Sequence, residues 1–251
     1  MIAEFEKMDI LGVRVSRLNV DQLIRSAIDR ARSRTKSTIL YVNIHVLNTA
    51  HRDAALRFQL NQADMVYCDG EGVRFASGML GRRLPERMTG ADWIVPLCKA
   101  CVARGISLSF IGSEPGVAAR AASLLQEQYA GLKILSAHHG YLAESKINSA
   151  AIAAVKAARP DILLVGMGTP AQERWIAANR PALEAPVVWA VGALFDFVAG
   201  VQPRGPQWMC NHGMEWACRL MSNPGRLGTR YLLGNPLFFW RVLMQCARVS
   251  R

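Results

Sequence analysis

The stretch Asp161-Ile-Leu-Leu-Val-Gly-Met-Gly-Thr-Pro-Ala-Gln-Glu-Arg-Trp175 indicates a buried strand, a glycine turn and a helix that begins at Pro170. The stretch Ser107-Leu-Ser-Phe-Ile-Gly-Ser-Glu-Pro-Gly116 repeats this order, with a helix start near Pro115. A strand that leads through glycine into a helix presents free backbone N–H groups at the edge of a sheet. Two such junctions would suit a diphosphate, although many turns of this kind bind nothing.

Short apolar runs rich in Val and Ile alternate with amphipathic helical patterns along most of the chain. This alternation is typical of an α/β fold of the Rossmann-like kind, a mostly parallel sheet with helices on both faces. Strands are predicted at residues 10–15, 38–42, 65–68, 108–111, 132–137, 162–165 and 187–191. Helices are predicted at residues 20–32, 91–103, 117–129, 146–158 and 171–179.

The pattern changes near residue 200, where Gly and Pro interrupt the chain and no further strand is predicted. We predict an α/β catalytic domain over residues 1–200 and a basic, helical, membrane-associating appendage over residues 201–251. The appendage holds seven Arg and one acid, Glu215, and so carries about +6 of the net charge of +11. Such a basic segment suits an anionic partner.

The last helical pattern of the appendage is both aromatic and basic. Arg241, Gln245 and Arg248 fall on one face at helical spacing, and apolar residues cover most of the rest: Phe238, Phe239, Trp240, Val242, Leu243 and Met244. We expect this helix to lie in an anionic membrane interface with its arginines at the headgroups. Docking onto the domain core or onto a subunit is the alternative, and no nucleic-acid partner is expected.

Composition and motifs exclude several classes of protein. Neither a signal peptide nor a membrane-spanning helix is predicted. The six cysteines lack the spacing of a secreted disulfide framework, and Cys98 and Cys101 are expected to pack in the core. The chain contains no G-x-S-x-G, Walker lysine or H-E-x-x-H motif. Residues 166–171 fit a loose G-x-G-x-x-A pattern, which leaves a nicotinamide-dependent oxidoreductase as a weak alternative.

The candidate chemical groups follow strand ends. Asp69 comes directly after a predicted strand, where open α/β sheets place their sites, and is the leading candidate for a general base. No metal site is predicted, because the neighbouring Glu71 completes no known ligand cluster. An anionic substrate would contact the turn glycines and the arginines of a polar loop: Gly112, Gly168, Arg82, Arg83 and Arg87.

Several motifs occur together in one order along the chain: Asp69-Gly70-x-Gly72, Leu84-Pro85-Glu86-Arg87-Met-Thr-Gly90-x-Asp92, Gly166-Met-Gly168-x-Pro170-x-Gln172-Glu173, Gly192-Ala-Leu-Phe-Asp196, and Tyr231-Leu-x-Gly234-Asn235-Pro236. With these motifs the chain resembles the WecG/TagA/CpsF glycosyltransferase family, glycosyltransferase family 26, over nearly its whole length.

The resemblance implies a metal-independent, inverting transferase without a cofactor. Such an enzyme moves a sugar from a UDP-sugar to an undecaprenyl-diphosphate-linked sugar at the cytoplasmic face of the membrane, in the synthesis of teichoic acids, capsules or exopolysaccharides. We therefore expect a cytoplasmic protein attached peripherally to the inner face of the cell membrane. A basic membrane or nucleic-acid adaptor is the non-enzymatic alternative. The donor sugar, the acceptor sugar, the linkage and homo-oligomerisation stay open.

The resemblance also assigns roles to single residues. The family's proposed base falls on Asp69, its strand-end Asn on Asn43 and its sugar-pocket Gln on Gln172. Its appendage arginines fall on Arg219, Arg226 and Arg230, which would bind the diphosphate. Two departures stand out. Tyr41 replaces the usual Thr of a Thr-x-Asn motif beside the substrate, so no N-acetylmannosamine donor is assumed, and Gly225 stands where a second Arg is usual.

Overall fold

The computed structural model describes residues 4–142, 144–202, 225 and 228–249. Its centre is a six-stranded sheet of order β4-β3-β8-β7-β5-β6, in which every neighbouring pair is parallel. The predicted parallel sheet is therefore confirmed. The strands are β3 (Ser37–Val42), β4 (Met65–Cys68), β5 (Ser107–Gly112), β6 (Lys133–His138), β7 (Ile162–Gly166) and β8 (Val187–Ala190).

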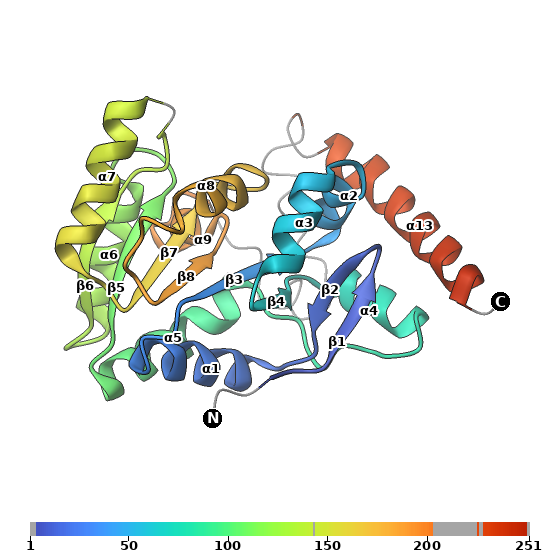
Figure 1. Cartoon of the computed structure of the whole chain (residues 1–251), viewed down its shortest axis with the longest axis horizontal. Helices are drawn as coiled ribbons and strands as arrows, with labels where there is room; N and C mark the ends of the chain where they lie inside the picture. Colours follow the sequence, from blue (N-terminus) through green and yellow to red (C-terminus); the bar gives the residue numbers. More distant parts are fainter. Residues whose placement is uncertain (1–3, 143, 203–224, 226–227, 250–251) are drawn as a thin grey trace.

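Helices cover both faces of the sheet, as the sequence predicts (Figure 1). On one face α1 (Val20–Arg32) contacts α5 (Gly90–Arg104), and α9 (Leu194–Val198) contacts α5 and α6 (Val117–Gln128). The other face carries α2 (Ile44–Arg52), α3 (Ala54–Gln62), α8 (Ala171–Asn179) and α7 (Ser145–Ala158). Because both faces are covered, all residues of β4, β5, β7 and β8 are buried, which explains their continuous apolar sequences.

The prediction of a single strand at residues 10–15 is wrong. The chain forms instead an antiparallel hairpin of β1 (Lys7–Ile10) and β2 (Val13–Ser16). Leu11 and Gly12 turn the chain with φ of 54° and 82°, a region that glycine adopts easily. The hairpin lies beside the sheet edge, where the Ser16 hydroxyl accepts the backbone N–H of Val66 in β4 at 3.3 Å.

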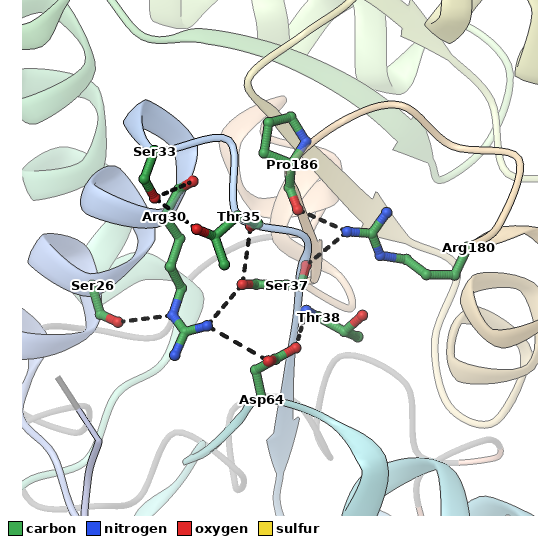
Figure 2. A network of polar contacts seen from close by, with 9 residues as sticks. All are labelled: Ser26, Arg30, Ser33, Thr35, Ser37, Thr38, Asp64, Arg180 and Pro186. Atoms are coloured by element: carbon green, nitrogen blue, oxygen red, sulfur yellow. Dashed lines mark hydrogen bonds and ion pairs between the residues drawn. The ribbon is translucent and has the colours of Figure 1, made fainter. Parts of the chain in front are cut away.

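A polar network joins elements at the amino ends of β3 and β4 (Figure 2). The buried guanidinium of Arg30 in α1 donates to the Ser37 hydroxyl at 2.8 Å and lies 3.5 Å from a carboxylate oxygen of Asp64. The other oxygen of Asp64 accepts the backbone N–H of Thr38 at 2.8 Å. Arg180 donates to the carbonyls of Ser37 and Pro186. These contacts fix β3 against α1 and β8 at the edge opposite the strands' carboxyl ends.

The last helix, α13 (Gly234–Val249), follows the π-helical turn η1 (Thr229–Leu233) and lies against α2 and α4 (Glu71–Met79) (Figure 1). Phe238 and Val242 are fully buried there, and Phe239 contacts the ring of Phe75 in α4. The helix therefore docks on the α/β domain through one apolar stripe.

The polar face of α13 also contacts the domain. Arg241 donates to the side-chain oxygen of Asn48 at 2.7 Å, and Gln245 bonds to Asp9 and to the backbone N–H of Leu11. The expectation that Arg241 lies at lipid headgroups is therefore wrong, because its guanidinium is engaged by Asn48 of the domain. Arg248 is exposed.

The outer face of α13 and η1 is apolar and exposed: Leu232, Leu233, Trp240, Leu243 and Met244 are 41–67% exposed. Among the described residues, no helix has both the length and the hydropathy needed to cross a bilayer.

Candidate active site

The carboxyl ends of β3 and β4 bring together two of the predicted catalytic residues. Asn43 follows β3 and Asp69 follows β4, and the last residues of these strands, Val42 and Cys68, pair with each other. The Nδ2 group of Asn43 donates to Oδ2 of Asp69 at 3.2 Å. The backbone N–H of Asp69 donates to the carbonyl of Val42 at 2.8 Å, which fixes the start of the turn.

Asn43 has a second contact that restricts its side chain. It is the N-cap of α2, and its Oδ1 accepts the backbone N–H of Val46 at 3.0 Å. Because the amide oxygen is held by the helix, the amide nitrogen must point the other way, toward Asp69. The cap therefore also orients a neighbour of the candidate base.

The third predicted catalytic residue, Gln172, lies in the first turn of α8 and is fully buried. Its Nε2 donates to Oε1 of Glu173 at 2.8 Å, and its Oε1 accepts the backbone N–H of Gly192, which follows β8, at 3.1 Å. Both ends of the amide are thus engaged by protein groups. The predicted contact of Gln172 with a sugar stays a prediction.

Tyr41 extends this buried network to β3. Its hydroxyl lies close to the side chains of Thr169 and Gln172, which lower its pKa slightly. Burial is the main cause that raises the pKa of Tyr41, and the nearby acids Glu173 and Asp69 raise it further, so the phenol stays neutral. A Cβ atom on Gly192 would lie 2.6 Å from this hydroxyl, so the phenol fills the space beside Gly192.

Glu173 is a site residue for which no role is predicted from the sequence. It is 1% exposed, and its Oε1 accepts hydrogen bonds from Gln172 and from the Thr169 hydroxyl at 2.9 Å. Burial raises the pKa of this carboxyl. Its position could have pointed to the site, because Glu173 comes one residue after Gln172 in the first turn of the helix that follows the buried strand β7. An acid there usually interacts with the helix dipole in solvent.

The two glycine turns lie where the strand connections diverge. From β5 the chain passes through α6 to β6, and from the adjacent β7 it passes through α8 to β8 in the other direction. A Cβ atom on Gly112 would lie 2.2 Å from the carbonyl oxygen of Gly166, so no other residue fits. Gly168 has φ of 76° and faces open space. Ligands of open α/β sheets bind at such a divergence.

The three arginines of the 82–87 loop have acidic partners. Arg82 pairs with Glu6, and Arg83 lies 3.6 Å from Glu71; both arginines are mostly exposed. Arg87 lies 3.4 Å from Asp92 in the first turn of α5. The next residue, Met88, donates its backbone N–H to the carbonyl of Cys68 at 3.0 Å, so the backbone beside Arg87 is joined to the end of β4, next to Asp69.

The structure gives little information on the appendage arginines that are predicted to bind the diphosphate. Arg219 and Arg226 lie outside the described residues. Arg230 belongs to η1, and only its backbone is described. The prediction for the cysteine pair is confirmed, because Cys98 and Cys101 are both buried in α5.

The parallel sheet, with Asn43 and Asp69 at its carboxyl edge, places the protein among the doubly wound α/β proteins that have a polar site at the carboxyl ends of their strands. The chain belongs to the glycosyl transferase WecG/TagA/CpsF family, whose family model matches residues 8–251. The resemblance found in the sequence is thereby confirmed, and the protein is a glycosyltransferase.

The similarity to known enzymes extends over nearly the full length of both chains. The chain is 27% identical over 247 residues to the N-acetylglucosaminyldiphosphoundecaprenol N-acetyl-beta-D-mannosaminyltransferase of Staphylococcus aureus strain MW2, with 98% of this chain and 95% of the relative covered. The enzyme of strain NCTC 8325 gives the same values, and that of strain MRSA252 is 26% identical over 247 residues with the same coverage.

Proposed function

We propose that the protein moves a sugar from a UDP-sugar to an undecaprenyl-diphosphate-linked sugar in the synthesis of a bacterial cell-surface polysaccharide. The full-length similarity to the staphylococcal enzymes, whose name gives an undecaprenyl-linked N-acetylglucosamine acceptor, supports the acceptor class. The observation that carries the chemistry is the 3.2 Å contact between Asn43 and Asp69 at the carboxyl edge of the sheet. Tyr41 fills the space beside Gly192, at a position where the family usually has Thr, so the proposal leaves the donor sugar open.

Asp69 is the proposed general base. Its carboxylate takes the proton of the acceptor hydroxyl while that oxygen attacks the anomeric carbon and UDP leaves from the opposite face. One base and no covalent intermediate give inversion at this carbon. A positioned base of this kind contributes about 10²–10⁴-fold to the rate. The Asn43 amide holds the carboxylate so that its second oxygen is directed to the acceptor.

The departing diphosphate needs positive charge and N–H donors. The N-terminal turns of α6 and α8 suit this role, because their N-cap residues, Gly116 and Pro170, provide no side-chain cap. Gly112 and Gly168 let the backbone approach the ligand closely, and we assign the remaining charge to the appendage arginines: Arg219, Arg226 and Arg230. This arrangement needs neither a metal ion nor a cofactor.

The lipid acceptor calls for contact with a membrane. We assign this contact to the exposed apolar face of α13, with Trp240, Leu243 and Met244 in the interface and Arg248 at anionic headgroups. The enzyme would then attach peripherally to the inner face of the cell membrane.

The test is a transfer assay with a panel of UDP-sugars and a polyprenyl-diphosphate-linked N-acetylglucosamine in detergent micelles. The wild-type protein should form a product that is one sugar heavier and release UDP. Asp69→Asn should lower turnover at least about 100-fold and keep the thermal shift produced by UDP. Asp29→Asn, which changes an exposed carboxylate in α1, serves as the matched control.

Two outcomes would overturn the proposal. Full turnover by Asp69→Asn would remove Asp69 from the role of base. A thermal shift with NADH, together with no shift with UDP and no product from any UDP-sugar, would instead support a nicotinamide-dependent enzyme.

A further inference from the structure

Glu173 is a buried carboxyl group that the proposed reaction does not use. It is 1% exposed, and only one of its two oxygens has partners: Oε1 accepts hydrogen bonds from Thr169 and Gln172. Its Oε2 is buried without a hydrogen-bond partner among the described residues. Nor does any ion pair between described residues include Glu173.

No positive charge offsets the burial of Glu173 among the described residues. Tyr41 from β3 and Asp69 from the end of β4 are the titratable groups of the same network, and neither of them supplies positive charge. Thr169, from the turn between β7 and α8, and Gln172, from the first turn of α8, donate to one oxygen and lower the pKa of Glu173, but burial has the larger effect and raises it. A buried carboxyl without a counter-charge is more stable in its protonated form.

The contacts of Glu173 determine how Gln172 is oriented. An amide that donates to Glu173 must turn its oxygen the other way, and that oxygen accepts the backbone N–H of Gly192. The same amide contacts the Tyr41 hydroxyl. Through Gln172, Glu173 is therefore linked to the ends of three neighbouring strands, β3, β7 and β8.

We infer that Glu173 is a positioning residue of the glycosyltransferase site, a neutral carboxylic acid that fixes the Gln172 amide between Gly192 and Tyr41. Its role in turnover rests on the proposed function, whereas its protonation state does not. The network lies directly beside Asn43, because Tyr41 and Asn43 are two residues apart at the end of β3. Loss of the acceptor oxygen would free the Gln172 amide to rotate and would release the Tyr41 hydroxyl.

Two variants of the full-length protein test whether Glu173 is a neutral acid or a charged carboxylate. Glu173→Gln keeps an acceptor oxygen and removes the titration, whereas Glu173→Leu removes the acceptor. Glu184→Gln is the matched control, because Glu184 is an exposed carboxylate 3.6 Å from Arg159. The first measurement is the midpoint of thermal unfolding, Tm, between pH 4 and pH 9 without substrate.

The sign of the pH effect follows from the raised pKa. A group that binds its proton more tightly in the folded state stabilises the fold below its unfolded pKa, and this stability is lost as the pH rises through the folded pKa. Glu173→Gln should therefore match the wild type near pH 4 and have a higher Tm above the folded pKa, by about 2–4 °C. Glu173→Leu should have a lower Tm at every pH, and Glu184→Gln should show no such rise.

The second measurement is kcat in the transfer assay. Glu173→Gln should retain most of the wild-type kcat, and Glu173→Leu should lose about tenfold or more with a smaller change in KM. If the Tm of Glu173→Gln equals or falls below the wild-type value at every pH, the inference that Glu173 is a neutral acid is wrong. A normal kcat for Glu173→Leu would overturn the positioning role. If the wild type transfers no sugar, the proposed function fails, and the Tm series still decides the protonation state.

Discussion

Asn43 uses the two ends of one amide for two tasks: Oδ1 caps helix α2 through Val46, and Nδ2 donates to Oδ2 of Asp69 at 3.2 Å. The helix and the candidate base are therefore coupled through a single side chain. A rotation that moves one contact also moves the other, because the amide oxygen and nitrogen are bonded to the same planar carbon.

Asn43→Ser should separate the two tasks. Serine is as good an N-cap as asparagine, so stability should change by less than about 0.5 kcal/mol, whereas Asn43→Ala should cost about 1 kcal/mol. Both variants lose the donor to Asp69, and kcat should fall about tenfold or more in each. Urea unfolding and the transfer assay measure the two effects. Normal turnover of a stable Asn43→Ser protein would show that Asp69 needs no such support.

Gly192→Ala should destabilise the protein through Tyr41. The added Cβ would lie 2.6 Å from the Tyr41 hydroxyl, and Gly192 has φ of 57°, so the expected cost is about 1–3 kcal/mol. Tyr41→Phe removes the atom in closest contact. In the double variant the cost of Gly192→Ala should shrink by about 0.5–1 kcal/mol, as a double-mutant cycle in urea measures. Strict additivity would mean that the hydroxyl and the Cβ do not meet.

Arg30→Met should lower stability without affecting catalysis. The substitution removes the contacts of a buried guanidinium with Ser37 and Asp64, at a cost of about 1–3 kcal/mol in urea unfolding. These contacts lie at the amino ends of the strands (Figure 2), so KM and kcat at 20 °C should stay at wild-type values. Arg159→Met, which changes a mostly exposed ion pair with Glu184, should leave stability nearly unchanged. A changed KM for Arg30→Met would contradict this separation of the two edges.

The double variant Trp240→Ser/Leu243→Ser should weaken binding to vesicles. Because these two side chains are about half exposed, each would contribute about half of the ~1.5–3 kcal/mol of a fully exposed side chain, so the partition coefficient onto vesicles rich in phosphatidylglycerol should fall at least about tenfold. Leu124→Ser is the control, since α6 lies at the far end of the molecule from α13 (Figure 1). Vesicle flotation measures binding, and equal flotation of the double variant and the control would contradict a membrane role for α13.

The parallel strands could be predicted because each is a short apolar run that ends at a polar or glycine residue. Asp69 and Gly166 are examples, and β4 and β7 begin at the predicted residues. The hairpin β1–β2 was missed because Ile10, Val13 and Val15 read as one run, whereas Gly12 turns the chain back. The nine-residue helices α2, α3 and α4 were not predicted, although Asn43 and Asp53 are N-cap residues of α2 and α3.

The sequence identified the separate site residues better than their relationships. Asn43 and Asp69 could be found at strand ends, but only the folded sheet brings residues 26 positions apart into contact. Glu173 had no role in the sequence analysis because its burial depends on packing between β7, β8 and β3. Arg241 and Gln245 have the spacing of an interfacial face, yet Asn48 and Asp9 supply partners that no local pattern reveals.

The contact between Gln245 and the backbone of Leu11 joins groups that are 234 residues apart in the chain. Domains of a growing polypeptide fold from the amino end as they leave the ribosome, so the first hairpin is complete long before α13 has been translated. Helix α13 can pack against the domain only after the residues up to its own end have been translated. A product that stops before α13 would consequently lack the surface assigned to the bilayer, and such a chain would not bind the membrane.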